Sequence, residues 1–372
     1  MSIRLEEEEG GRGILCLNFN QNQECFACGT TSGFCIFNVD PFTETFRREF
    51  KGGSIGYVAM LYRCNILALV GGGRSPCFLT NKVVLWDDHL STCTGELSFR
   101  SEVKTVKLRR DLIVVALENS VYVYQFQTLD LLEKFSTREN PKGLVALSTG
   151  EENVVLACPA SDGRGRVRVE IFSPEDHNQR ISTFVDAHES GLSQLTLSAD
   201  GSLLATASTK GTLIRIFDTG TGRKIKEVRR GADNAVIYCI CFSPDNRFLA
   251  CTSDKGTVHI FAVNAPELSV EGGSESGGVS SEGSSSSSSQ KIPENRKSRM
   301  SMFGSFTSYF KSEWSFAKFK GPEIPTIAAF GKSSDTLYLL SADRMYRKLT
   351  FDPVNGGTAE EVLSERFLSE EE

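Results

Sequence analysis

Two adjacent arginines, Arg229 and Arg230, are the residues of this sequence whose type and position most directly suggest chemistry. They lie in the stretch 224–231, between two similar segments, 191–217 and 235–261. If this stretch is a strand, consecutive side chains point to opposite faces, so the two guanidinium groups would reach two different places. Guanidinium groups bind phosphate well, so the pair could serve two anion sites. The alternative is an exposed edge strand whose charges prevent aggregation, and the dipeptide alone favours this alternative.

The two flanking segments contain further groups that suit an anion. Residues 208–212 read Ser-Thr-Lys-Gly-Thr, and residues 253–257, at an offset of 45 residues, read Ser-Asp-Lys-Gly-Thr. His259 follows the second threonine on the same face of a predicted strand. The first segment has one extra residue at this point, so a β-bulge would bring Arg215 to the equivalent face. Hydroxyl groups mixed with cations suit phosphate, although the same motif is also ordinary hairpin chemistry.

Sequence signatures of enzymes are missing. Residues 331–333 read Gly-Lys-Ser but lack the preceding glycine of a phosphate-binding loop, and the glycines 71–73 open no predicted helix. Cys25 and Cys28 have the spacing of half a zinc site, but no second Cys or His pair completes it. The sequence therefore predicts a non-catalytic binding module without a cofactor or a metal.

Composition restricts the compartment and the partners. The net charge of −6 argues against wrapping of nucleic acid, so any anion binding must be local. The eleven cysteines, an odd number, suggest reduced thiols in the cytoplasm rather than a disulfide scaffold. No apolar run reaches the ~20 residues of a membrane span, so any membrane contact should be peripheral.

A repeat of about 40–45 residues with several short strands per unit is typical of propeller blades. Seven copies can be found, at residues 14–39, 57–88, 103–126, 143–172, 191–217, 235–261 and 326–351. We therefore predict an all-β fold, a single WD40-like seven-bladed β-propeller over 1–372. The N- and C-terminal segments are expected to close the last blade, with acidic tails at 1–12 and 365–372. A monomer is expected.

One stretch, 264–312, interrupts the sixth copy. Residues 269–289 contain eleven serines and cannot build a core, so we predict a flexible insertion within blade six. Residues 314–320 then resemble the missing outer strand of that blade. Near the end of the insertion, basic residues flank an apolar face at helical spacing, formed by Met302, Phe303, Phe306, Tyr309 and Phe310. Such a face suits a lipid headgroup layer, whereas packing on the propeller or a protein contact is the alternative.

Together these segments resemble the PROPPIN family, the phosphoinositide-binding propellers of autophagy. Further matching motifs are Leu67–Gly73, Val84–Asp88, Asn140–Leu144, Ala187-His188 and Trp314–Phe319. The resemblance implies two shallow rim sites for phosphatidylinositol 3-phosphate and phosphatidylinositol 3,5-bisphosphate. By position, the first site would use His188, Ser208, Thr212, Arg215 and Arg229. The second site would use Arg230, Ser253, Lys255, Thr257 and His259. Asp233 lies near the place where the family often has a histidine.

The same resemblance implies a cellular role. The insertion would enter phosphoinositide-containing membranes, and the turn at Asn20 and Asn22 would contact an autophagy lipid-transfer rod protein. The protein would be cytoplasmic and recruited peripherally to preautophagosomal and endosomal or vacuolar membranes, as a scaffold in autophagosome formation. The alternative is a generic WD-repeat protein-interaction scaffold that does not bind lipid.

Overall fold

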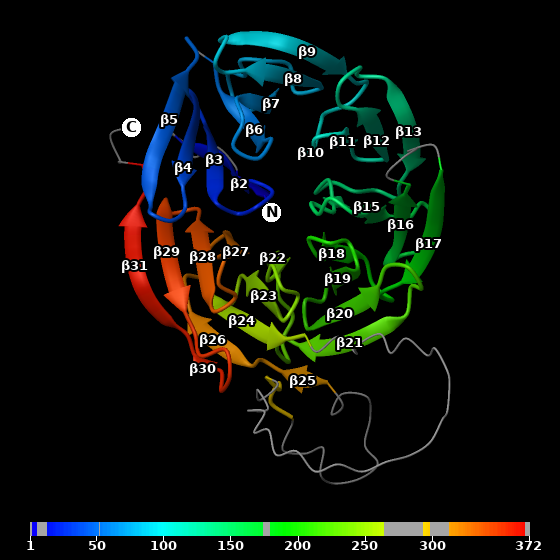
Figure 1. Ribbon diagram of the computed structural model, residues 1–372, viewed down its shortest axis with the longest axis vertical. Helices are drawn as coiled ribbons and strands as arrows, with labels where there is room; N and C mark the ends of the chain where they lie inside the picture. The colour runs from blue at the N-terminus through cyan, green and yellow to red at the C-terminus, as the bar shows by residue number, and fades with distance from the viewer. Residues whose placement is uncertain are drawn as a thin grey trace, which may run out of the picture.

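The computed structural model describes residues 2–5, 13–51, 53–173, 179–263, 293–297 and 312–368. Their regular elements are all strands, which form seven sheets arranged around a central axis (Figure 1). The prediction of an all-β, seven-bladed propeller is therefore confirmed. Each sequence copy forms one blade, and the blades are numbered here in chain order.

The blades consist of consecutive strands that run from the axis to the rim. Blade one contains β1 (Ser2–Arg4), β2 (Ile14–Phe19), β3 (Cys25–Thr30), β4 (Gly33–Asn38) and β5 (Thr43–Glu49). Blade two contains β6 (Ile55–Met60), β7 (Ile66–Gly71), β8 (Lys82–Asp87) and β9 (Thr92–Ser98). Blade three contains β10 (Thr105–Leu108), β11 (Leu112–Ala116), β12 (Ser120–Gln125) and β13 (Leu131–Ser136). Blade four contains β14 (Ala146–Leu147), β15 (Val154–Pro159), β16 (Arg166–Phe172) and β17 (Arg180–Asp186).

Of the last three blades, blades five and six include strands that arrive from later in the chain. Blade five contains β18 (Leu192–Leu197), β19 (Leu203–Ser208), β20 (Leu213–Asp218), β21 (Lys224–Arg229) and β25 (Glu313–Trp314). Blade six contains β22 (Ile237–Phe242), β23 (Phe248–Ser253), β24 (Thr257–Ala262), β26 (Ala317–Lys320) and β30 (Gly357–Thr358). Blade seven contains β27 (Thr326–Phe330), β28 (Thr336–Ser341), β29 (Met345–Thr350) and β31 (Glu360–Arg366).

The hydrophobic core lies between neighbouring blades. Every residue of the second strands β3, β19 and β23 is buried, because both faces of each strand pack against adjacent sheets. The outer strand β5, by contrast, has no buried residue. Burial of both faces explains why the inner strands have near-continuous apolar sequences.

The prediction that the two chain ends complete the last blade holds for the C-terminal segment, whose strand β31 is the outer strand of blade seven, but is wrong for the N-terminal segment. All four strands of blade seven come from residues 326–366, so no N-terminal strand belongs to the sheet of this blade. The N-terminal strand β1 pairs instead with β2, at the axial side of blade one. The first and last blades lie side by side and close the propeller by packing (Figure 1). The aromatic rings of Phe42 and Tyr346 stack across this boundary, with their centroids 4.5 Å apart.

The chain that follows the insertion contributes to two blades. Residues 317–320 form β26, the outer neighbour of β24, which confirms the predicted outer strand for that part. Glu313 and Trp314, however, pair in parallel with β21 of blade five, so this part of the prediction is wrong. In the predicted tails, residues 2–4 form β1 and the side chains of Phe367 and Leu368 are buried.

Candidate functional site

The paired arginines lie at the boundary between blades five and six. Arg229 is the last residue of β21, as the predicted strand requires, and Arg230 follows it directly. Each residue is only 5% exposed. The strand β21 lies between β20 and β25, with Arg229 opposite Trp314. At this end β21 is therefore not an exposed edge, so the edge-strand interpretation of the arginines is wrong.

Arg230 is held by backbone carbonyls of the blade-five hairpin and of the linker to blade six. Its Nε donates to the carbonyl oxygen of Gly211 at 2.8 Å, and its Nη2 donates to the carbonyl oxygen of Asp233. Burial, and then the positive charges of Lys318 and Arg230, lower the pKa of His259 to about 3. The imidazole of His259 is therefore neutral near pH 7, beside a charged guanidinium.

Arg215 and His188 form a second polar group, on blade five. Arg215 donates from Nε to Glu227 at 2.9 Å and from Nη1 to the carbonyl oxygen of Ala187 at 2.6 Å. His188 Nε2 lies 3.0 Å from the hydroxyl of Thr206. Burial, and then the charge of Arg215, lower the pKa of His188 to about 4, so this imidazole is also neutral.

The remaining predicted site residues lie near the two equivalent hairpins. Ser208 and Ser253 end strands β19 and β23, and both are buried. Thr212 and Thr257 are half-buried where the returning strands begin. Lys255 is exposed, and its Nζ forms an ion pair with Oδ2 of Asp254 at 3.4 Å. The structure thus brings Arg215 into contact with the loop of His188 and places Arg230 close enough to His259 for their charges to interact, and it pairs Arg229 with Leu213 in the ladder.

The extra residue of blade five does not form the predicted bulge. The pairing of β19 with β20 is continuous from Leu203 opposite Asp218 to Ala207 opposite Ile214. The additional residue is instead accommodated in the turn before Leu213. Arg215 still lies at the position equivalent to His259, because they pair with Thr206 and Cys251 respectively.

Three contacting residues were not predicted from the sequence. Glu227 accepts hydrogen bonds from Arg215 and, at 2.9 Å, from the hydroxyl of Ser312. Burial opposes ionisation of Glu227, but these hydrogen bonds outweigh it and hold its pKa below the ordinary value. The hydroxyl of Ser315 lies 2.7 Å from His259 Nδ1. Single serines in a serine-rich region carry no sequence signal, although Ser315 lies within the motif Trp314–Phe319.

The predicted partner turn lies on blade one, between β2 and β3. Asn20 is buried, donates to the carbonyl oxygen of Tyr62 at 3.1 Å and accepts from the backbone N–H of Cys25 at 3.1 Å. Asn22 is exposed and donates to Glu24 at 2.8 Å. Asn20 therefore shapes the turn, whereas Asn22 is accessible to a partner.

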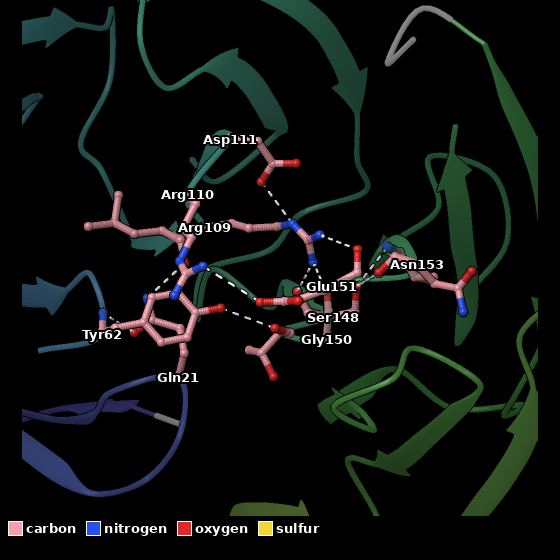
Figure 2. A network of polar contacts seen from close by, with 12 residues as sticks. Gln21, Tyr62, Arg109, Arg110, Asp111, Ser148, Gly150, Glu151 and Asn153 are labelled. Carbon is pink, nitrogen blue, oxygen red and sulfur yellow. Dashed lines mark hydrogen bonds and ion pairs between the residues drawn. The ribbon is translucent and has the colours of Figure 1, made fainter. Parts of the chain in front are cut away.

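A polar network connects this turn to blades two, three and four (Figure 2). Gln21 donates to the carbonyl oxygens of Met60 and Leu108, and the hydroxyl of Tyr62 donates to the carbonyl oxygen of Thr149. Figure 2 also shows Arg110 next to the ring of Tyr62, with its guanidinium carbon 5.1 Å from the ring centroid. These contacts hold the loops of four blades together on one face.

Several predictions fall on residues that the structure does not describe, namely the membrane-insertion residues Met302, Phe303, Phe306, Tyr309 and Phe310.

In the described part of the chain, no group of three or more His, Cys, Asp or Glu residues could hold a metal ion. No helix in that part is long and apolar enough to cross a membrane. A cavity of about 570 Å³ lies among the inner strands, but its lining includes neither paired arginine.

Comparisons with known proteins agree with this architecture. A family model described as PROPPIN matches residues 13–280. Autophagy-related protein 18e of Arabidopsis thaliana is 35% identical over 370 residues, which cover 99% of this chain and 91% of that protein. Kluyveromyces lactis Hsv2 has a TM-score of 0.73 at 22% identity, covering 95% of this chain and 98% of that one. The structure of the complex of KlAtg21 with the coiled coil of AgAtg16 has a TM-score of 0.73 at 23% identity, and the match covers 96% of this chain and 100% of that one. At such identities the two structures support the fold alone.

Proposed function

Since this chain belongs to the PROPPIN family of non-catalytic, Atg18-like autophagy propellers, we propose that it is a phosphoinositide effector. It binds the headgroups of phosphatidylinositol 3-phosphate and phosphatidylinositol 3,5-bisphosphate at two rim sites. The first site comprises His188, Ser208, Thr212, Arg215 and Arg229. The second site comprises Arg230, Ser253, Lys255, Thr257 and His259.

The observation that carries this proposal is the environment of Arg230. Its guanidinium is buried and, among the described residues, it donates to two backbone carbonyls and forms no ion pair with a carboxylate. A buried cation without an anionic partner is unfavourable, so a bound phosphate would compensate it. Neutral imidazole and hydroxyl groups nearby can donate or accept the remaining hydrogen bonds.

Two weak headgroup contacts and the aromatic end of the insertion would act as one multivalent anchor. Once one contact forms, the others become intramolecular and gain from a high effective concentration. Such an anchor would recruit a cytoplasmic protein to preautophagosomal and endosomal or vacuolar membranes. There it would act as a scaffold in autophagosome formation, with the turn at Asn22 contacting a lipid-transfer rod protein.

A direct test is calorimetry with a soluble headgroup, inositol 1,3-bisphosphate. Wild-type protein should bind it, and the Arg229→Thr/Arg230→Thr variant should not. Thermal unfolding of both proteins shows whether the variant remains folded. Equal binding by two folded proteins would contradict the proposal.

A second candidate function is a protein-interaction scaffold that does not bind lipid. The network of Figure 2 favours it, because Arg110 and Glu151 are 73% and 89% exposed at their side chains on a rigid set of loops. KlAtg21, a structural relative, is known in complex with a coiled coil. A scaffold of this kind would be unaffected by the change of both arginines.

A further inference from the structure

The segment that follows the insertion contacts both proposed headgroup sites. Its residues Glu313 and Trp314 form β25 and pair with Val228 and Arg229 at the end of β21, on blade five. Two residues later, the backbone N–H of Phe316 donates to the carbonyl oxygen of Ile260 on blade six at 2.8 Å. Residues 312–316 therefore cross the boundary between the blades, next to the paired arginines.

The segment begins with a contact to the first site. The hydroxyl of Ser312 donates to Glu227 Oε1 at 2.9 Å, and Oε2 of the same carboxylate accepts from Arg215 Nε at 2.9 Å. Ser312 is 3% exposed, and the carboxylate that accepts its hydrogen bond is partly buried. A carboxylate held at both oxygens fixes the direction in which Arg215 presents its guanidinium.

The segment continues with a contact to the second site. The hydroxyl of Ser315 lies 2.7 Å from Nδ1 of His259, and Ser315 is 1% exposed. A hydroxyl can either donate to Nδ1 or accept from it, so the contact is compatible with both tautomers and fixes the orientation of the ring. Ser315 therefore orients the imidazole of His259 relative to a ligand.

Other contacts hold the segment in place. Glu313 forms an ion pair with Lys226 at 3.0 Å and accepts a hydrogen bond from Asn295 at 2.8 Å. The amide of Asn295 also bonds to both backbone groups of Ala262, at the end of β24. The segment is thus attached to blade five, to blade six and to residues 293–297.

From these contacts we propose that Ser312 and Ser315 are positioning residues, one for each headgroup site. This inference rests on the proposed phosphoinositide function. Ser312 acts through Glu227 on Arg215, and Ser315 acts on His259. Because coupling between sites is reciprocal, a bound headgroup also stabilises the attachment of residues 312–316 to the propeller.

The test separates the two sites by using single-arginine backgrounds. Arg230→Thr leaves the first site, and Arg229→Thr leaves the second. In each background, calorimetry with inositol 1,3-bisphosphate compares Ser312→Ala with Ser315→Ala. Ser312→Ala should weaken binding about fivefold in the first-site background, as expected for one lost hydrogen bond, and Ser315→Ala should do so in the second-site background. The control is Ser198→Ala, a buried serine that bonds to Asp200 on the same blade away from both sites.

Equal losses in both backgrounds, or no loss in either, would overturn the inference. A second measurement does not depend on any variant. Hydrogen exchange of residues 312–316 in the wild-type protein should slow when the headgroup is added, and unchanged exchange despite measured binding would also overturn it. Absence of headgroup binding by wild-type protein would instead refute the proposed function itself.

Discussion

The hydroxyl of Tyr346 donates a 2.8 Å hydrogen bond to the backbone carbonyl of Val39 and so joins the last blade to the first. No strand is shared across this boundary, so side-chain packing and side-chain contacts close the ring. Besides this hydrogen bond, Asp40 of blade one forms an ion pair with Lys348 at 2.6 Å and accepts from the hydroxyl of Tyr338 at 3.1 Å. Tyr346 and Val39 are both almost fully buried.

We expect Tyr346→Phe to lower the free energy of unfolding by about 1–2 kcal/mol, because a buried carbonyl loses its donor. Urea unfolding measures the change. A suitable control is Tyr124→Phe, since the hydroxyl of half-buried Tyr124 forms no hydrogen bond within the described residues. If both variants were equally stable, the hydrogen bond would not be what secures the boundary.

The two buried histidines should make stability depend on pH. Folding lowers the pKa of His188 to about 4 and that of His259 to about 3, mainly through burial. The unfolded chain therefore binds more protons below pH 6.5, and stability falls as the pH drops from there toward the folded pKa values. Near pH 5 each histidine should account for about 2 kcal/mol of the loss relative to pH 7.

The histidine prediction is checked by urea unfolding at pH 7 and pH 5. His188→Asn should lose less stability over this interval than wild type. His89→Asn, at an exposed position, should show the wild-type loss. An unchanged pH response in His188→Asn would mean that His188 titrates normally in the folded protein.

The two glycines near the arginines should respond differently to substitution. Gly211 has a φ of +65°, and an added Cβ would lie 2.0 Å from the carbonyl oxygen of Ala235. The carbonyl oxygen of Gly211 accepts the hydrogen bond from Nε of Arg230. Gly211→Ala should therefore lower the free energy of unfolding by about 1–3 kcal/mol and weaken headgroup binding.

Gly231 is the matched control, because a Cβ there would meet no atom within 4 Å. Gly231→Ala should change stability by less than about 0.5 kcal/mol and preserve headgroup binding. Calorimetry and urea unfolding of both variants test this pair. Similar effects at the two positions would contradict the role given to the Gly211 turn.

The asparagines of the turn on blade one should separate stability from partner binding. Asn20→Ala should be destabilised by about 1 kcal/mol or more, because two hydrogen bonds of a buried side chain are lost. Asn22→Ala should unfold like wild type but bind the purified lipid-transfer rod protein more weakly in a pull-down. Full retention of the partner by Asn22→Ala would remove this turn from the proposed interface.

Much of the fold could be predicted because the repeat has physical causes that leave clear sequence patterns. Inner strands such as β19 and β23 are buried on both faces, so their apolar runs and the shared hairpin motif identify blades five and six. The closure of the ring could not be predicted, since the three residues of β1 have no pattern that specifies a partner strand. The two-residue parallel pairing of β25 with β21 also has no sequence pattern that would predict it.

The arrangement of the candidate site could be predicted only in part. The equivalent positions of Arg215 and His259 on neighbouring blades followed from the overlay of the two segments. Glu227 lies in the same stretch as the paired arginines, but its role depends on Ser312, more than eighty residues away in the chain. Contacts across such a distance depend on how the insertion returns to the propeller, and no local pattern encodes this.

The most direct test of the central claim is liposome flotation with and without phosphatidylinositol 3-phosphate, for wild type and for Arg229→Thr/Arg230→Thr. We predict that wild type floats only with the phosphoinositide and that the folded variant does not float. Equal behaviour of the two folded proteins would contradict the claim that the buried arginines bind the lipid headgroup.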